Sequence, residues 1–209
     1  MKVVVFGASG KVGQKVVAEL LSRGHEVRAF VRGISPFDDQ ANLQVVSGDI
    51  KDLVSVKVAV KDQDAVISVL GSWGTKTKDI LSEGMKNIIP SMDAFGVKRI
   101  VSLTGADALY STDKPGLINK LTRPFLKLIV PKILADGEKH IELLVASDLD
   151  WTVIRSPVMN EKGDSGYWLA NESSKPWQTV NRSSVVLALV DIAESGAWSK
   201  QAPVIFRTK

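Results

Sequence analysis

Cysteine is absent from the 209-residue chain, and histidine occurs only twice, as His25 and His140. Without thiols the chain forms no disulfide, no thiolate nucleophile and no zinc–thiolate site. Two histidines are too few for a metal centre built from imidazole ligands. The sequence therefore predicts no resident metal.

Long apolar runs are missing as well. No stretch approaches the roughly 20 consecutive apolar residues that a membrane-spanning helix requires. The first residues lead directly into an apolar stretch at residues 3–6, without the charged and apolar regions of a secretory signal. We therefore expect a cytoplasmic protein that makes no contact with a membrane.

The chain has no strong excess of charge: 27 Lys and Arg residues against 23 Asp and Glu residues give a net charge of +4 at pH 7. No basic cluster with interleaved aromatic residues stands out, so we expect no nucleic acid partner. An anionic small-molecule ligand accounts for part of the excess. With 44% hydrophobic and 24% charged residues, the composition predicts one ordinary globular domain over residues 1–209.

The chain does contain a glycine triplet between two apolar stretches. Residues 3–6 predict a strand, apolar residues at helical spacing follow the triplet as far as Gly24, and residues 26–31 predict a second strand. Such a strand–glycine turn–helix–strand unit is the context that a dinucleotide-binding motif requires. The glycines of this GxxGxxG motif are Gly7, Gly10 and Gly13.

Each glycine has a separate predicted role. Gly7 allows a sharp turn out of the strand, Gly10 allows the backbone to approach a pyrophosphate, and Gly13 allows helix and sheet to pack closely. The phosphates are then expected at the helix N-terminus, where free N–H groups and the helix dipole favour negative charge.

Arg32 ends the second predicted strand. An acidic residue at this place binds the ribose 2′-hydroxyl of NAD, whereas an arginine accommodates the 2′-phosphate of NADP. The sequence therefore predicts NADP(H) as the cofactor.

Two later strand ends are expected at the same edge of a parallel sheet. Residues 43–47 predict a strand followed by Asp49 and Ile50, which we place beside the adenine ring. Residues 65–70 predict a buried strand, and the loop that leaves it contains two glycines, Gly71 and Gly74, which allow close backbone approach to a cofactor. That edge is where open parallel sheets bind ligands.

The middle of the chain combines regular elements with one segment of uncertain type. Residues 79–94 predict a helix that Pro90 kinks or ends early. Residues 99–103 predict a strand that carries Thr104 to the functional edge. Residues 107–131, which contain several prolines, predict an irregular insertion that covers the site as a lid, packs as an appendage or contacts a partner.

The last third continues the alternation. Residues 138–147 predict a helix and residues 151–155 a strand, and the loops within residues 156–181 are expected on the substrate side. Ser183 or Ser184 is expected to cap a helix that precedes the last strand, residues 203–207. We therefore predict a single-domain α/β fold with a Rossmann-like, doubly wound, mostly parallel sheet.

Six segments resemble the atypical short-chain dehydrogenase/reductases, an NAD(P)H-binding family. The biliverdin reductase B/flavin reductase group is the most similar, and NmrA-like proteins are also similar. The segments are residues 7–13, 31–32, 48–50, 69–71, 82–88 and 147–152. The resemblance implies direct hydride transfer from NADPH to a planar acceptor such as a flavin. The cofactor contacts it implies, together with the motif, are Gly7, Ser9, Gly10, Lys11, Val12, Gly13, Arg32, Asp49, Ile50, Leu70, Gly71, Ser72, Thr104 and Pro157.

The chain departs from that group at two positions. Gly105 stands where the group carries an active-site serine, which leaves Thr104 as the nearest hydroxyl and the candidate catalytic residue. Val158 stands where the group carries a histidine. Tyr110 and Lys114 have the spacing of the tyrosine–lysine pair of ordinary short-chain dehydrogenases, but in a segment that runs into a proline.

Without a convincing acid, carbonyl chemistry has little support, whereas flavin reduction can take its proton from solvent. The protein then mostly binds and orients two rings. Candidate residues on the acceptor side are Trp73, Val158, Met159, Tyr167 and Trp168. We expect an NADPH-dependent reductase of flavins or similar quinonoid small molecules, present as a monomer or homodimer.

Two alternatives stay open. The missing serine and histidine also fit a catalytically silent NADP(H)-binding regulator of the NmrA-like kind. A sugar-nucleotide epimerase or dehydratase is a third hypothesis, although the chain is short of the usual substrate domain.

Overall fold

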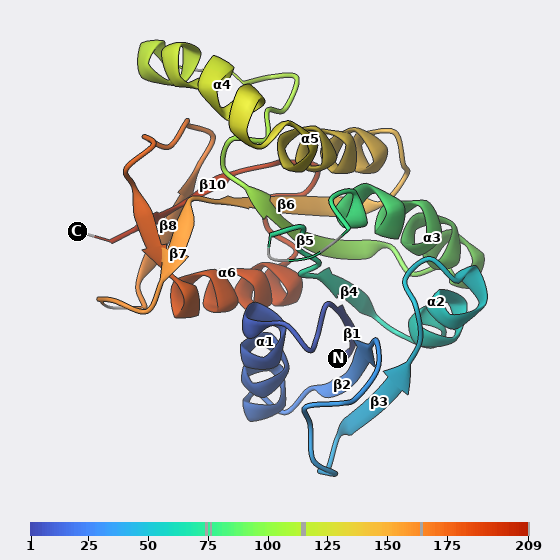
Figure 1. Cartoon of the computed structure of the whole chain (residues 1–209). Helices are drawn as coiled ribbons and strands as arrows, with labels where there is room; N and C mark the ends of the chain where they lie inside the picture. Colours follow the sequence, from blue (N-terminus) through green and yellow to red (C-terminus); the bar gives the residue numbers. More distant parts are fainter. Residues whose placement is uncertain (74, 76, 114–115, 164, 209) are drawn as a thin grey trace.

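A sheet of eight strands with helices packed on both faces forms the centre of the protein (Figure 1). The computed structural model describes residues 1–73, 75, 77–113, 116–163 and 165–208. Its strands are β1 (Lys2–Phe6), β2 (Glu26–Val31), β3 (Leu43–Ser47), β4 (Ala65–Ser68), β5 (Arg99–Gly105), β6 (Asp150–Ser156), β7 (Val158–Asn160), β8 (Tyr167–Ala170), β9 (Thr179–Asn181) and β10 (Val204–Arg207). Its helices are α1 (Lys11–Ser22), α2 (Leu53–Val60), α3 (Ile80–Phe95), α4 (Leu117–Ile129), α5 (Pro131–Val145) and α6 (Arg182–Ser195).

The strand order is β3-β2-β1-β4-β5-β6-β10-β8, and β7 pairs with β9 in a small separate sheet. All neighbours in the large sheet are parallel except β8, which runs antiparallel to β10. The order 3-2-1-4-5-6 is that of doubly wound dinucleotide-binding sheets, in which ligands bind where the winding reverses, here between β1 and β4. The structure confirms the predicted single-domain, Rossmann-like fold.

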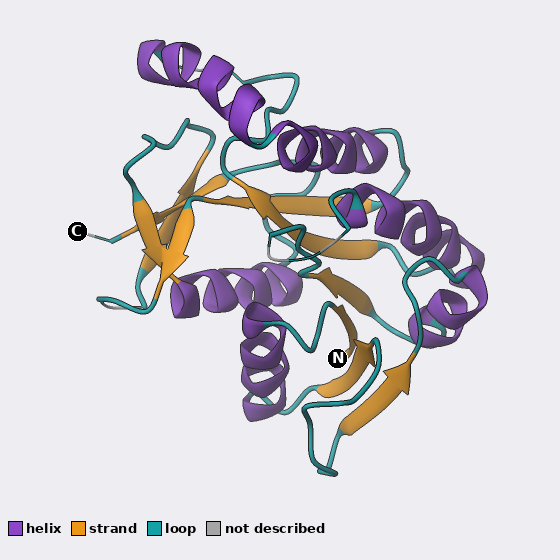
Figure 2. Ribbon diagram, in the orientation of Figure 1, coloured by secondary structure: helices purple, strands orange, loops and turns teal. Residues whose placement is uncertain are grey.

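Two hydrophobic cores lie on the two faces of the sheet. Helices α1 and α6 cover one face, while α2, α3 and α5 cover the other (Figure 2). Along β1, Val3 and Val5 belong to the first core, whereas Val4 and Phe6 belong to the second. Successive side chains of a strand point to opposite faces, so a strand covered on both sides is apolar throughout. This explains the uninterrupted apolar residues of β1.

Helix ends show where local patterns are sufficient and where they are not. Asp52, a residue type favoured at the start of helices, caps α2, because its carboxylate accepts hydrogen bonds from the N–H groups of Val54 and Ser55. The predicted serine cap of α6 was wrong: Asn181 caps this helix through the N–H of Ser183. Pro90 does not end α3, which continues to Phe95, since the buried face of the helix outweighs one missing hydrogen bond.

The expectation of an irregular segment at residues 107–131 was wrong for its second half. Residues Leu117–Ile129 form α4 even though Pro124 lies inside it. Pro131 begins α5, at a helix position where the missing N–H has no cost. Among the described residues, no helix is long and apolar enough to cross a membrane.

His140, on α5, is fully buried against β5. Its Nε2 lies 2.9 Å from the Ser102 hydroxyl, and its Nδ1 has no hydrogen-bond partner in the described part of the chain. Burial disfavours the charged imidazolium and lowers the pKa of His140 from 6.5 to about 4. The folded protein therefore holds His140 neutral in mildly acidic solution.

This burial predicts a loss of stability in acid. Between pH 6.5 and pH 4 the unfolded chain binds a proton at His140 that the folded chain does not, so stability falls as the pH is lowered. For His140→Gln we expect the decrease in unfolding free energy between pH 7 and pH 5 to be about 2 kcal/mol smaller than in the wild type. Urea unfolding at both pH values measures it, with His25→Gln as the control. Equal decreases in the wild type and His140→Gln would contradict the prediction.

Candidate dinucleotide site

The turn between β1 and α1 is shaped by backbone contacts that exclude side chains. Gly7 has a φ of 79°, a conformation that favours glycine. A Cβ atom on Gly13 would lie 2.1 Å from the Gly7 carbonyl oxygen, and one on Gly7 would lie 2.7 Å from the Val69 carbonyl oxygen. Only glycine fits at either position, so the roles predicted for the first and third glycines agree with the geometry.

The N-terminus of α1 is open to receive an anion. Gly10 occupies the N-cap position, no side chain caps the helix, and its first turn contains no acidic residue. Ser9, Gly10 and Lys11 are exposed. Unpaired N–H groups and the helix dipole together favour a phosphate at such a terminus. The residues present therefore fit the diphosphate of a dinucleotide.

The parallel strand β2 pairs with β1, and β3 pairs with β2, so the ends of β2 and β3 lie along the same edge of the sheet as this turn. Arg32 is exposed and forms no hydrogen bond or ion pair with the described residues, so its guanidinium is available to a ligand. Asp49 is exposed and accepts a hydrogen bond from the N–H of Lys51. Ile50 is buried against α3, where Asn87 donates to its carbonyl oxygen at 2.8 Å. Asp49 and Ile50, the polar and apolar residues predicted beside the adenine ring, are thus adjacent at this edge of the sheet.

After β4, the chain is held by a contact that the sequence analysis missed. Leu70 packs against Gly84 of α3, where a Cβ would come within 2.6 Å of the leucine side chain. Ser72 is buried, and its hydroxyl donates to the carboxylate of Asp136 on α5 at 2.7 Å. Gly71 has open space around it. Gly74, the second glycine predicted in this loop, lies outside the described residues.

Asp136 is a buried carboxylate that joins three segments. Besides Ser72, it accepts hydrogen bonds from the N–H groups of Leu81 and Ser82 at 3.1 and 2.9 Å and from the Ser82 hydroxyl at 2.6 Å. These N–H groups belong to the first turn of α3, whose own N-cap residue, Asp79, makes no capping bond. Asp136 therefore caps α3 from a different helix and fixes the loop after β4.

One feature of the sequence could have indicated the role of Asp136. Asp136 lies between Leu134 and His140, which are both buried on the same helix. A charged residue on the apolar side of a helix requires partners, because an unpaired buried charge is costly. The partners themselves are 54 to 64 positions away in the chain, so only the folded structure identifies them.

Near the end of β5, the two candidate proton donors that the structure describes, Thr104 and Tyr110, are buried or packed in the core. Thr104 is 8% exposed, and a Cβ on Gly137 of α5 would lie 2.7 Å from its hydroxyl oxygen. Tyr110 packs edge-on against Trp151 in the core between the sheet and α5, with ring centroids 5.9 Å apart. Its predicted partner, Lys114, lies outside the described residues. The tyrosine side chain is thus directed into the core.

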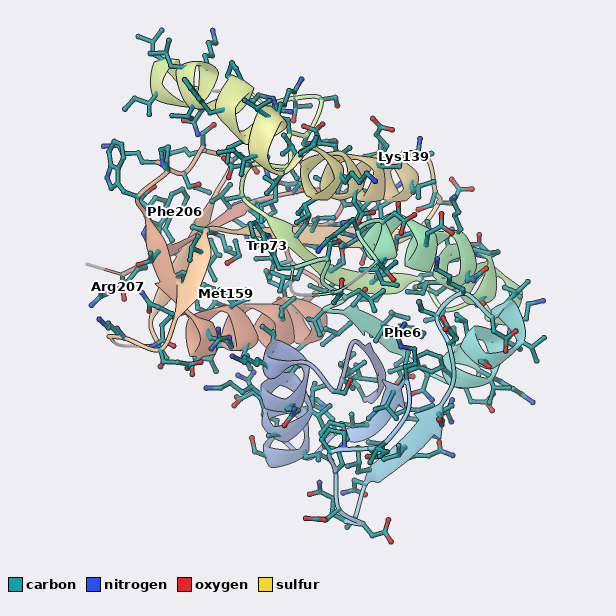
Figure 3. All side chains as sticks on the ribbon, viewed as in Figure 1. Phe6, Trp73, Lys139, Met159, Phe206 and Arg207 are labelled. Atoms are coloured by element: carbon teal, nitrogen blue, oxygen red, sulfur yellow. The ribbon has the colours of Figure 1, made fainter. Side chains whose placement is uncertain are left out.

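The residues predicted on the acceptor side come from separate parts of the chain, and Figure 3 labels two of them, Trp73 and Met159. Pro157 and Val158 follow the end of β6, and Val158 is exposed, whereas Met159 packs against the core. Trp73, after β4, is 72% exposed. Trp168 stacks on Phe206 with ring centroids 4.4 Å apart, so one of its faces is already covered. Trp73 and Val158 therefore present the freer apolar surfaces.

Tyr167, the remaining acceptor-side candidate, points elsewhere. Its hydroxyl donates to Asp191 of α6 at 2.5 Å, and its ring packs against the core on that face of the sheet. Burial and the neighbouring carboxylate raise the pKa of Tyr167 above its usual value. This tyrosine is engaged in joining β8 to α6.

The fold and the open turn after β1 define a dinucleotide-binding protein of the Rossmann class. The sequence pattern of the NAD(P)H-binding family matches residues 7–195. The chain belongs to this family, and NAD(P)(H) is its cofactor.

Individual relatives are more distant. A 3-beta-hydroxysteroid dehydrogenase from Mycolicibacterium neoaurum is 36% identical over 112 residues, which are 48% of this chain and 31% of the relative. The chain thus spans about a third of the length of that relative. A short-chain dehydrogenase/reductase from Veillonella parvula in complex with NADP is 19% identical, with a TM-score of 0.79 over 99% of this chain and 94% of that one.

ChuY, an anaerobillin reductase from Escherichia coli O157:H7, is 20% identical, with a TM-score of 0.76 over 99% of this chain and 97% of that one. At such low identity, both solved structures show that the fold is shared. The comparisons therefore support an oxidoreductase-like protein that uses NAD(P)(H).

The hydrogen bonds of Asp136 predict different effects for two aspartates at one helix terminus. In the wild type, the donors from Ser72, Leu81 and Ser82 bind the two carboxylate oxygens of Asp136. Asp136→Asn leaves a single side-chain oxygen for these donors, so we expect the unfolding free energy to fall by about 2–3 kcal/mol. We expect the Kd for NADPH to rise severalfold as well, because Ser72 is released. Asp79→Asn is the control, since its side chain caps nothing. Chemical denaturation and coenzyme titration measure both effects; equal behaviour of the two variants would disprove the role of Asp136.

Proposed function

We propose that the protein is an NADPH-dependent reductase that transfers hydride to a flavin or a similar planar quinonoid acceptor. The observation that carries this proposal is the chemistry of the sheet edge. Thr104 is nearly buried beside Gly137, and Tyr110 packs against Trp151. Reduction of a carbonyl needs a proton donor for the developing alkoxide, whereas a quinonoid ring can take its proton from water.

Reduced nicotinamide supplies the hydride when it is bound. The chain's own contribution is to bind and orient two planar molecules. The α1 N-terminus would hold the diphosphate, Arg32 the 2′-phosphate, and the segment held by Asp136 the nicotinamide end. Trp73 and Val158 would offer apolar surface to the acceptor. ChuY, which shares the fold, is an anaerobillin reductase, and this supports a small-molecule acceptor for hydride.

The catalytically silent NADP(H)-binding regulator is the second candidate. It is favoured by Gly105 and Val158, which stand where the flavin reductase group carries a serine and a histidine. Both candidates need the same cofactor site, and they differ in turnover.

Arg32 predicts the choice between the two coenzymes. Arg32→Asp replaces a cation with an anion beside the predicted 2′-phosphate, so we expect NADPH affinity to fall at least tenfold and NADH affinity to equal or exceed it. Lys139→Asp changes the net charge equally on the outer side of α5 (Figure 3), and we expect it to keep the wild-type preference. Fluorescence titration with both coenzymes measures the effect. Unchanged affinities in Arg32→Asp would refute the assignment.

A turnover assay separates the two candidate functions. We expect the purified protein to oxidise NADPH in the presence of FMN, riboflavin or a soluble quinone, and Trp73→Ala to raise the KM for the acceptor more than it lowers kcat. Trp177→Ala, which removes an exposed tryptophan of the 171–178 loop, is the control. Tight NADPH binding without oxidation with any of these acceptors would select the regulator instead.

A further inference from the structure

Helix α4 presents an apolar face that no described residue covers. None of its residues is buried. In Figure 1 it lies at the edge of the molecule beyond α5, away from the sheet. Five of its large apolar side chains are 68 to 81% exposed: Leu117, Leu121, Phe125, Leu128 and Ile129. At about 100° per residue, these five fall within an arc of about 120°.

The opposite side of α4 attaches it to the protein. Asn119 donates to the carbonyl oxygen of Ser174 at 2.8 Å. Arg123 donates to the carbonyl oxygen of Asp107 at 2.9 Å and forms an ion pair with Glu138 of α5. On the same helical geometry, both residues lie away from the apolar arc. The helix is therefore held in one orientation, with its apolar face directed outward.

The charge around this face has one sign. Residues 117–135 contain four basic residues and no acidic one. Lys120, Lys127 and Lys132 are exposed and form no ion pair with described carboxylates, and the first two lie together on one side of the apolar arc. A second copy of the chain would bring two such cationic helices together without an acidic residue in either to compensate. Charge complementarity thus favours an anionic partner.

The adjoining loop adds an exposed aromatic residue. Ser174, which binds Asn119, is followed by Lys175 and by Trp177, which is 66% exposed. The Lys175 ammonium lies 5.8 Å from the centre of the Trp177 ring. Tryptophan beside lysine is characteristic of surfaces at the boundary between lipid headgroups and acyl chains.

We propose that α4 docks the protein on an anionic lipid surface, with its apolar face inserted among the headgroups and its lysines against lipid phosphates. A helix with large apolar residues on one side and Lys or Arg beside them lies in the plane of such an interface. The predicted absence of membrane contact followed from the lack of a spanning run, which an interfacial helix does not need.

Sedimentation with vesicles tests the proposal. We expect the protein to pellet with vesicles made of equal parts phosphatidylcholine and phosphatidylglycerol, and to stay in the supernatant with phosphatidylcholine alone. The double substitution Leu121→Gln, Phe125→Gln should lower the partition coefficient at least tenfold. Lys120→Gln, Lys127→Gln should lower it about fivefold for each lysine, because one basic residue contributes about that factor near an anionic surface.

A matched control removes exposed apolar side chains elsewhere. Val54 and Val58 on α2 are 69 and 56% exposed, and Val54→Ser, Val58→Ser should partition as the wild type does. Thermal unfolding by circular dichroism verifies that every variant is folded. The assay needs neither coenzyme nor turnover, so its outcome is independent of the proposed reductase activity.

Three results would overturn the proposal. The first is that the wild-type protein does not sediment with either kind of vesicle. The second is that the double variant Leu121→Gln, Phe125→Gln partitions onto the anionic vesicles as strongly as the wild type does. A wild-type dimer in sedimentation velocity, converted to monomer by the same double variant and without vesicle binding, would assign the face to a second copy of the chain.

Discussion

The close approach between the start of α1 and the turn after β1 is the contact on which the site depends. Gly13 lies against the carbonyl oxygen of Gly7 with no room for a Cβ atom. Helix α1 begins directly after this turn with Gly10 as its N-cap, and no side chain caps its first N–H groups. The anion site predicted at this helix terminus is thus a consequence of backbone packing between two elements.

A second constraint acts after β4, on the other side of the place between β1 and β4 where the winding of the sheet reverses. The buried carboxylate of Asp136 is stabilised by hydrogen bonds from the first turn of α3 and from Ser72. It replaces the N-cap that Asp79 does not provide, and it couples α5, α3 and the loop after β4 into one unit. Removing the charge therefore affects the helix start and the loop together, since both depend on the same two oxygens.

The segment after β5 shows how tertiary contacts decide the use of a motif. Tyr110 and Lys114 have the spacing of a catalytic pair, yet Tyr110 packs on Trp151. Asp113 pairs with the buried Arg155 of β6, with Arg155 Nη2 donating to it at 2.9 Å. This ion pair holds the loop against the sheet and turns the tyrosine into the core. Further along the chain, α4 lies outside the packed layers, and its apolar face has no partner among the described residues.

The sequence by itself determined the seven parallel strands of the central sheet, the glycine turn and the place of Arg32 directly after β2. It did not determine β7 and β8, which lie within residues 156–181, where loops were predicted. Each of these depends on local patterns: apolar strands buried on both faces, helical periodicity and glycines at fixed spacing. Only the tertiary structure decided the cap of α3 by Asp136, the orientation of Tyr110 and the helical state of residues 117–129. The cap and the orientation of Tyr110 depend on contacts between residues far apart in the chain. Helix α4 buries none of its residues, and hydrogen bonds and an ion pair from Asn119 and Arg123 attach it to Ser174, Asp107 and Glu138. Local patterns do not contain these contacts, because the partners lie in other segments of the chain.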